Sequence, residues 1–241
     1  CRTTRTSDAA TMPNEAATVI RRTAAELNTV CTDVANELYD TRDVVFDESS
    51  FTQSFSAGSY RLQLGLAGDM QQRNAALALT VLQFMAGKFG FDLDTALTGF
   101  ADASWPGRIQ RLTPDLLLDG AHNPEGAAIL VESLRRFYPG ERFTFIFGNF
   151  EDKDTAAILR QLIPIAAEFI FVPIRAERPS RAPEWLCHCA AGLGKVPVRG
   201  VHDLATALEL PSAGRRVVAG SLYLAGELLQ LRHGKAAACD I

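Results

Sequence analysis

Two side chains that can bind ligands and exchange protons, Asp119 and His122, lie between a short apolar stretch and an Ala-rich helix in the run 116–128. In open parallel sheets, ligands bind beyond the carboxyl ends of the strands. The three-residue spacing predicts that the carboxylate and the imidazole face one ligand. A purely structural interpretation makes the run a loop whose Asn123 caps the next helix, with Pro124 at its first position. That capping accounts for neither Asp119 nor His122.

Arg108 and Asn74 are two further candidates for ligand contact. Arg108 follows a Trp-Pro-Gly turn, and its guanidinium could clamp a phosphate with paired N–H donors. A salt bridge within a linker is an equally good interpretation. Asn74 lies in an Ala-rich helical segment, where asparagine is unfavourable without a hydrogen-bonding reason. A buried hydrogen bond or a ligand contact would supply that reason.

Lys153 and Ser221 also stand at predicted helix starts. Lys153 lies between two aspartates, a pattern typical of a solvated helix start, and a functional role is the alternative. Ser221 follows a glycine ahead of a helix, so it can cap that helix, and the same position can hold a carboxylate. Three histidines have no polar groups arranged around them and are interpreted as structural or exposed: His188, His202 and His233.

The sequence lacks the motifs of several common binding and catalytic chemistries. Cys187-His188-Cys189 offers too few ligands at too narrow a spacing for zinc, so we expect no metal site there. The sequence has no G-x-x-x-x-G-K-[ST], and therefore no phosphate-binding P-loop of its own. It has neither G-x-S-x-G nor H-E-x-x-H. No G-x-G-x-x-G follows a strand, which disfavours a nicotinamide dehydrogenase.

The second half of the chain alternates apolar strands with helical stretches. The strands are predicted at 116–118, 143–147, 169–172, 196–198 and 216–219, and the helices at 125–137, 154–166, 183–192, 203–209 and 222–232. Such alternation is typical of an α/β protein with a mostly parallel, doubly wound sheet. All strand-to-helix loops of that sheet lie at one edge. We therefore expect Asp119, His122, Lys153 and Ser221, with Arg175 and Arg178, to converge on one crevice.

The first half of the chain does not show this alternation of strands and helices. We expect residues 1–11 to be disordered, a helix from Pro13, strands at 44–46 and 60–64, and helices at 71–88 and 92–102. The turn Ser104-Trp105-Pro106-Gly107-Arg108 separates this region from the α/β pattern. We predict two domains, 1–103 and 104–241.

Bulk properties exclude several protein classes. With 241 residues, 47% hydrophobic and 22% charged, the chain has the composition of a soluble globular protein. A net charge of −4 without basic clusters argues against a nucleic-acid partner. No apolar stretch is long enough to span a membrane, and no apolar core follows the N-terminus as in a secretory signal. Five cysteines at scattered spacings favour reduced thiols and a cytoplasmic protein.

These motifs together resemble the C-terminal half of folylpolyglutamate synthase/dihydrofolate synthase, a member of the Mur ligase superfamily. The resemblance covers roughly residues 12–232. It rests on five segments in the family's order: Gly68-Asp69-Met70-Gln71-Gln72-Arg73-Asn74-Ala75-Ala76-Leu77-Ala78-Leu79, Trp105-Pro106-Gly107-Arg108, Asp119-Gly120-Ala121-His122-Asn123-Pro124, Gly148-Asn149-Phe150-Glu151-Asp152-Lys153-Asp154 and Gly220-Ser221-Leu222-Tyr223-Leu224-Ala225-Gly226-Glu227.

The resemblance implies the last part of a P-loop ATPase domain in 1–103 and a Rossmann-like ligase domain in 104–241. The family uses ATP and Mg²⁺ to join L-glutamate to folate or dihydropteroate through an acyl phosphate. By resemblance, Arg108 and His122 approach the ATP phosphates, Asp119 the ribose and Asn74 the base. Lys153 and Ser221 lie in motifs of the glutamate side, and His122 and Lys153 are the implied catalytic residues. The implied partners are small-molecule substrates.

The sequence departs from the family pattern in two ways. Met70 stands where the family usually has His in G-x-H-Q-x-x-N. The P-loop, the magnesium ligands and a carbamylated lysine are expected upstream of residue 1, so we expect a monomer that is inactive alone or needs that half. The alternative is a non-catalytic nucleotide- or ligand-binding module.

Overall fold

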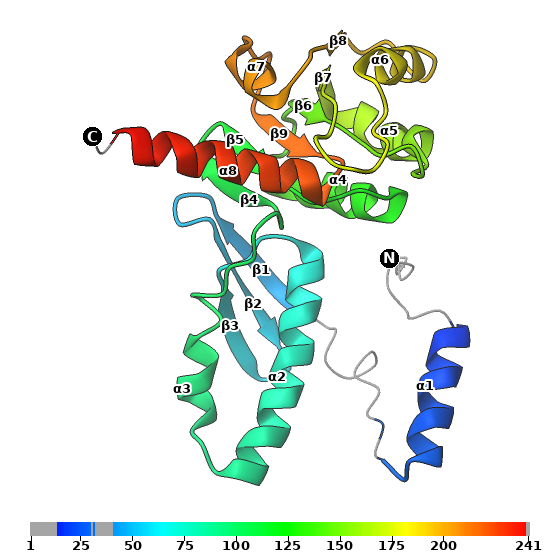
Figure 1. The fold of residues 1–241 in the computed structure, drawn as a ribbon. Coiled ribbons are helices and arrows are strands. Elements are labelled where there is room, and N and C mark those ends of the chain that lie inside the picture. The colour runs from blue at the N-terminus through cyan, green and yellow to red at the C-terminus, as the bar shows by residue number, and fades with distance from the viewer. Residues whose placement is uncertain (1–13, 30, 32–40, 240–241) are drawn as a thin grey trace, which may run out of the picture.

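The computed structural model describes residues 14–29, 31 and 41–239. Within them, two sheets lie on either side of the segment 104–109 (Figure 1). We call residues 41–103 the small unit and residues 104–239 the large unit. The disorder expected for residues 1–11 falls outside the described residues, and the predicted domain boundary lies between the two sheets.

The large unit is built on a six-stranded sheet in the order β4-β5-β9-β6-β7-β8. Its strands are β4 (Gln110–Thr113), β5 (Leu116–Leu118), β6 (Phe143–Phe147), β7 (Ala166–Phe171), β8 (Val198–Gly200) and β9 (Arg216–Ala219). Neighbouring strands run parallel, except that β4 is antiparallel to β5. The structure confirms the predicted α/β fold with a mostly parallel sheet.

Helices cover both faces of this sheet. One face packs against α4 (Pro124–Phe137), α5 (Thr155–Leu162) and α6 (Pro183–Ala191), and the other against α7 (Leu204–Glu209) and α8 (Leu222–Cys239). The four inner strands β5, β9, β6 and β7 are therefore buried on both sides, which is why they are largely apolar without alternation. In β6, Phe145 packs toward α4 and α5, while Ile146 packs toward α7 and α8.

The strand order creates a place for a ligand. β9 lies between β5 and β6, although it follows both in the chain. The helix after β5 covers one face and the helix after β9 covers the other. Where connections diverge in this way, a crevice opens beyond the carboxyl ends of the strands. The loops that leave β5, β9 and β6 border that crevice.

The small unit is an antiparallel sheet backed by helices. Its strands are β1 (Thr41–Asp47), β2 (Thr52–Ala57) and β3 (Tyr60–Leu64), and its helices are α2 (Asp69–Phe89) and α3 (Leu93–Thr98). Its core includes Phe55, Leu62 and Leu79. The helix α1 (Asn14–Glu26) lies apart from both units (Figure 1).

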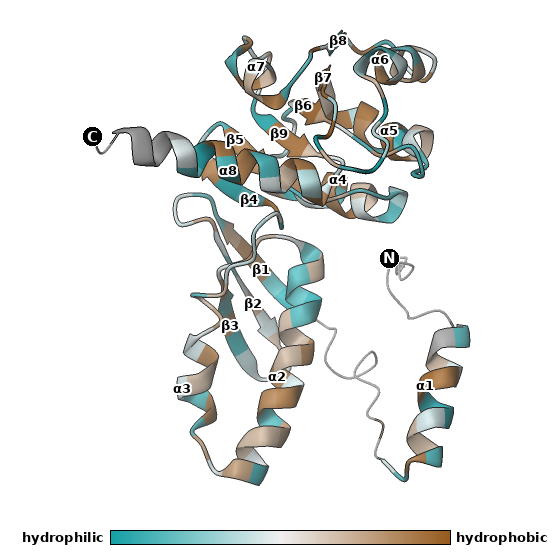
Figure 2. Ribbon diagram, in the orientation of Figure 1, coloured by the Kyte–Doolittle hydropathy of each residue, from teal (hydrophilic) through white to brown (hydrophobic). Residues whose placement is uncertain are grey.

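One side of α2 presents apolar side chains to solvent. Leu77, Val81, Phe84 and Met85 recur at helical spacing and are exposed, Phe84 by 71%. Figure 2 shows brown bands along this part of α2. Contiguous exposed apolar surface of this kind is uncommon on monomers. We call these four residues the α2 stripe.

The structure also differs from the predicted elements. Strands β2 and β4 were not predicted, because neither has an apolar run. The helix predicted at 154–166 ends at Leu162, and a 3₁₀ turn, η2 (Ile163–Ile165), leads into β7 at Ala166. The strand predicted at 196–198 is observed two residues later, as β8. The helix predicted at 92–102 ends at Thr98, where α3 ends.

The segment between the units adds one further feature. Trp105 is 66% exposed there and borders a hollow of about 280 Å³ together with Phe51 and Arg111. As for membranes, none of the helices in the described part of the chain is both long and apolar enough to cross one.

Candidate functional site

Four of the predicted ligand-contacting residues line one pocket of about 310 Å³: Asn74, Arg108, Asp119 and His122. The pocket lies between the first turns of α2, the linker, the loop after β5 and the start of α4. It is therefore built by both units. The sequence motifs alone placed these residues in three separate segments, and the fold brings them together.

Asp119 ties the linker to the loop. Its Oδ2 accepts a hydrogen bond from the Ile109 amide at 2.9 Å, and its Oδ1 accepts one from the Ala121 amide at 2.8 Å. Burial raises the pKa of Asp119 to about 6, although both amides, Arg108 and His122 favour the charged form. Ile109 has a φ of 43°, a left-handed conformation that the bond to Asp119 helps to hold.

Backbone hydrogen bonds connect the loops at this edge. The Gly120 amide donates to the Gly107 carbonyl at 2.8 Å, and the Gly220 amide donates to the Ala121 carbonyl at 2.8 Å. Gly220 has a φ of 107°, and a Cβ there would collide with the carbonyl oxygen of Gly148. The approach of these loops therefore needs glycine at position 220. The resulting frame leaves little freedom to the residues mounted on it.

The half-buried His122 presents one ring nitrogen to a ligand. Its Nδ1 lies 2.9 Å from the carbonyl oxygen of Gly120. Because a carbonyl only accepts, Nδ1 must carry the proton in this contact. Nε2 is then the acceptor of the neutral ring, and it becomes a donor when the ring is protonated. The imidazole can thus serve a phosphate oxygen or a hydroxyl.

Arg108 is exposed at the pocket, and it forms no ion pair within the described part of the chain. The linker salt bridge considered as an alternative is therefore not formed. Its charge acts on Asp119, where it favours the carboxylate. The guanidinium keeps its N–H donors for an anion.

The positive end of α4 also faces the pocket. Asn123, which caps the helix by accepting the Gly126 amide at 2.7 Å, lines the pocket together with Glu125 and Gly126. A helix of 14 residues carries partial positive charge at its N-terminus. With Arg108, this end favours a negatively charged ligand.

Asn74 contributes from the small unit. It is exposed on α2, where its Nδ2 donates to Oε1 of Gln71 at 3.1 Å. The buried hydrogen bond offered as the structural explanation of Asn74 is therefore wrong. Met70, which replaces the histidine of the family motif, lines the same pocket.

Ser133 on α4 also lines the pocket and was missed from the sequence. Its buried hydroxyl has no protein partner. A serine among apolar neighbours on a buried helix face was the available signal.

Lys153 and Ser221 do not line this pocket. Ser221 is buried, and its hydroxyl accepts the Tyr223 amide at 3.1 Å, in keeping with its interpretation as a helix cap. Nζ of Lys153 pairs with Asp152 at 3.0 Å, and Arg178 pairs with the same carboxylate at 2.8 Å. The hydrogen bond from Lys153 lowers the pKa of Asp152, with a further contribution from Arg178.

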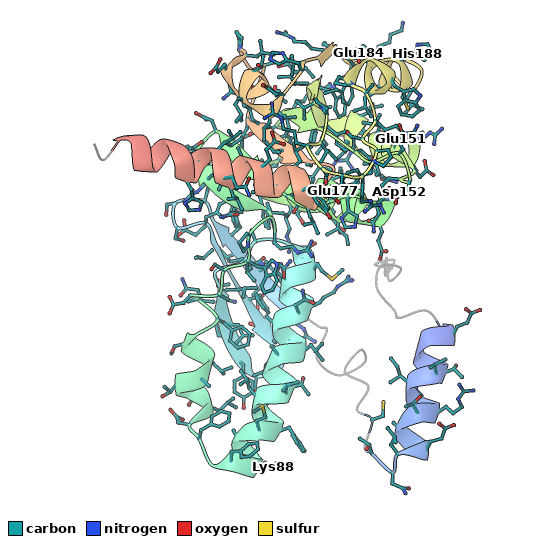
Figure 3. The ribbon with its side chains drawn as sticks, viewed as in Figure 1. Lys88, Glu151, Asp152, Glu177, Glu184 and His188 are labelled. Atoms are coloured by element: carbon teal, nitrogen blue, oxygen red, sulfur yellow. The ribbon has the colours of Figure 1, made fainter. Side chains whose placement is uncertain are left out.

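The loops after β6 and β7 form a second polar region. The Glu151 amide donates to the Pro179 carbonyl, and the Arg181 amide donates to the Asn149 carbonyl. Figure 3 shows Glu151, Asp152 and Glu177 gathered there. Beside this region, Arg175 and Glu227 border an open hollow of about 800 Å³ along α8. The single crevice expected from the sequence is thus divided between these two regions and the pocket at α4.

Comparison with known proteins identifies the family. The profile of "Mur ligase, glutamate ligase domain" matches residues 107–221. A folylpolyglutamate synthase from Lacticaseibacillus casei is 32% identical over 173 residues, covering 70% of this chain and 40% of the relative. The chain belongs to the folylpolyglutamate synthase/dihydrofolate synthase family. Its large unit is a Mur ligase C-terminal domain.

Solved structures of that family have the same fold. A Mycobacterium tuberculosis folylpolyglutamate synthase complexed with ADP has a TM-score of 0.74 at 24% identity, covering 91% of this chain and 53% of its own. An Escherichia coli structure with DHPP and ADP scores 0.72 at 22% identity, covering 91% and 51%. A Yersinia pestis enzyme with AMPPNP and Mn scores 0.68 at 25% identity, covering 92% and 51%.

Two of these structures thus hold ADP, and the third holds AMPPNP and a Mn ion. The chain spans about half the length of the structures that it matches. Across the described residues, no three His, Cys, Asp or Glu side chains are grouped as metal ligands. The described residues therefore do not fit a metal site of their own.

Proposed function

We propose that this chain supplies the C-terminal half of the ATP and glutamate cleft of an ATP-dependent ligase that adds L-glutamate to folate or dihydropteroate. One observation supports the proposal most directly. Asn74, Arg108, Asp119 and His122, which the family motifs assign to the nucleotide, line a single pocket at the carboxyl edge of the sheet. The N-terminus of α4 adds positive charge at the same place.

The geometry of the four side chains supports a proposed role for each. Arg108 has free donors and is proposed to bind the phosphates, with His122 Nε2 beside it. Each carboxylate oxygen of Asp119 accepts one backbone hydrogen bond and retains a second lone pair, which can accept a ribose hydroxyl. Asn74 can exchange its bond to Gln71 for the donors and acceptors of a base.

In the proposed reaction, the acceptor carboxylate attacks the terminal phosphorus of ATP, ADP leaves, and an acyl phosphate forms. The amine of L-glutamate then attacks the acyl carbon and displaces phosphate. Negative charge accumulates on the transferred group, so cations fixed at the pocket stabilise the transition state. Lys153 and Ser221 are proposed for the glutamate side, which would bind its carboxylates. Lys153 would first have to leave Asp152.

Nucleotide binding by the purified chain tests the proposal. ADP should bind to the 241-residue protein in isothermal titration calorimetry, and Arg108→Ala should weaken that binding. Arg199→Ala is the matched control, because Arg199 is an exposed arginine whose partner, Glu168, is on β7, and neither residue lines the pocket. Equal affinity of the two variants, or no ADP binding by the parent, would contradict the proposed site.

Activity distinguishes the ligase from a binding module. Adding a P-loop half of the family in trans should give ADP release that depends on both L-glutamate and a folate acceptor. ADP binding without any glutamate-dependent release would favour the alternative, a non-catalytic nucleotide-binding module.

A further inference from the structure

The two units touch at a second place, away from the pocket. The turn between β1 and β2 lies against the large unit (Figure 1). The ring of Phe46, at the end of β1, stacks on Phe137 of α4 with centroids 4.2 Å apart. Phe51, at the other end of the turn, meets the Phe46 ring edge-on at 5.4 Å. An aromatic contact therefore joins the units at the C-terminal end of α4.

Two arginines of the large unit hold this turn. Arg111 on β4 donates hydrogen bonds to the carbonyls of Glu48 and Ser49, the latter at 2.8 Å, and its guanidinium lies over the Phe51 ring at 4.9 Å. Arg215 binds the Glu48 carboxylate through Nη2 at 2.9 Å. Backbone, charge and ring contacts thus act on the same four-residue turn, Glu48–Phe51.

Arg215 is itself held firmly by its own unit. Its side chain is only 15% exposed and lies over the Tyr138 ring at 4.0 Å. Nη1 donates to the Pro114 carbonyl at 2.6 Å, and Nε lies 3.4 Å from the Glu141 carboxylate. A guanidinium fixed in this way loses little further freedom when it binds a carboxylate of the other unit.

The turn and the pocket both contact α4, so the contact at the turn can restrict how the small unit is oriented at the pocket. The pocket extends from the N-terminus of α4 to Ser133, and the turn contacts Phe137 at the C-terminus of the helix, so about one helical turn separates them along α4. Arg136, the residue before Phe137 on α4, binds Asp69 of α2 at 2.6 Å. Three contacts along one helix restrict rotation of the small unit far more than the pocket residues could alone.

We propose that Arg215 is a positioning residue: by binding Glu48, it sets the orientation in which Asn74 of the small unit completes the pocket of the large unit. This inference rests on the proposed function only in taking that pocket as a nucleotide site. Neither Arg215 nor Glu48 touches the pocket.

Two glutamates provide a matched pair for the test, because both bind Arg215 but only Glu48 crosses between the units. Glu48→Gln removes the cross-unit charge, and Glu141→Gln removes a contact within the large unit. Spin labels at Lys88→Cys on α2 and Glu184→Cys on α6, with the native cysteines replaced, report the orientation of the units by electron–electron resonance distances. Figure 3 shows both positions far apart on the surface.

We expect Glu48→Gln to broaden or shift the distance distribution and Glu141→Gln to leave it unchanged. ADP affinity should fall about threefold to fivefold in Glu48→Gln, as expected for the loss of one partly exposed ion pair, and stay at the parent value in Glu141→Gln. Arg215→Lys, which keeps the charge, should recover part of both effects relative to Arg215→Ala.

An unchanged distance distribution in Glu48→Gln would overturn the proposal. Equal broadening and an equal fall in melting temperature in both glutamate variants would also overturn it, since that pattern indicates a role in stability alone. If the distances respond as expected but the parent protein binds no ADP, positioning by Arg215 stands and the nucleotide function fails.

Discussion

At the residue scale, Asp119 and His122 stand three positions apart but have different environments. Asp119 is buried and accepts two backbone hydrogen bonds, so its first effect is to fix the linker against the loop. His122 is half-buried with a single local contact. A change at Asp119 should therefore affect stability and ligand binding, whereas a change at His122 should affect mainly the ligand.

We expect His122→Ala to weaken ADP binding about tenfold, because a charge-assisted hydrogen bond to phosphate contributes about 1.4 kcal/mol. The melting temperature should stay within about 2 °C of the parent, since the side chain makes one local contact. Calorimetry and thermal unfolding measure the two effects. His202→Ala is the control, because His202 is exposed in another loop of the large unit. A large fall in melting temperature would show that His122 is structural.

The raised pKa of Asp119 predicts a pH dependence of stability. The pKa of Asp119 is about 6 in the folded protein and 3.8 in the unfolded chain. Between pH 3.8 and pH 6 the folded state therefore binds more protons than the unfolded state. The free energy of unfolding should then decrease as pH rises from 4 to 7. For Asp119 alone the decrease is about 2 kcal/mol. Urea unfolding of the parent and of Asp119→Asn at both pH values measures it, and parallel behaviour of the two proteins would contradict the shift.

At the scale of elements, the strands buried on both faces were predicted better than the exposed ones. Leu116–Leu118, Phe143–Phe147 and Arg216–Ala219 were predicted with their observed bounds, because strands buried on both faces are continuous apolar runs. Strand β2 (Thr52–Ala57) has a single large apolar residue, Phe55, among mostly polar neighbours, so no such run marked it. Strand β8 contains one apolar side chain, Val198, and was misplaced by two residues.

Residues that line the pocket at α4 could be named from the sequence, but their arrangement could not. The motifs predicted four of the lining residues, whereas local sequence does not determine strand order. Because β9 lies between β5 and β6, the loop with Asp119 lies beside Ser221 rather than beside Lys153. Asn74 reached the pocket only through contacts between the units. These depend on side chains far apart in sequence, such as Asp69 and Arg136.

The close approach of loops at the carboxyl edge gives a test at this scale. Gly220→Ala should lower the free energy of unfolding at least about 2 kcal/mol more than Gly140→Ala. Both glycines have positive φ, but a Cβ at 220 meets the Gly148 carbonyl and the Phe147 ring, whereas a Cβ at 140 meets nothing within 4 Å. Urea unfolding compares the two variants. Equal losses would mean that backbone strain alone, not contact between loops, selects glycine at position 220.

At the scale of the whole molecule, the α2 stripe distinguishes the small unit from a closed globular domain. Its core includes Leu79, while Leu77, Val81 and Phe84 on the same helix face solvent. Exposed apolar surface of this extent is either a contact surface or an aggregation liability.

We expect Phe84→Gln to leave the free energy of unfolding unchanged within about 0.5 kcal/mol and to reduce the fluorescence of a bound hydrophobic dye. Leu79→Gln should instead lower the free energy of unfolding by about 3 kcal/mol, because Leu79 is fully buried. Denaturant unfolding and dye titration measure both effects. A strong loss of stability in Phe84→Gln would show that the stripe is packed in solution.

The exposed indole at the junction of the units has a practical consequence. The chain has two tryptophans, and Trp185 lies under the Arg181 guanidinium at 4.2 Å, remote from the junction. Trp105 borders the hollow that contains Phe51 and Arg111, so any swing of the β1–β2 turn changes the polarity around its ring. Emission from Trp105, read against a Trp185→Phe background, would therefore report hinge movement in real time without any attached label.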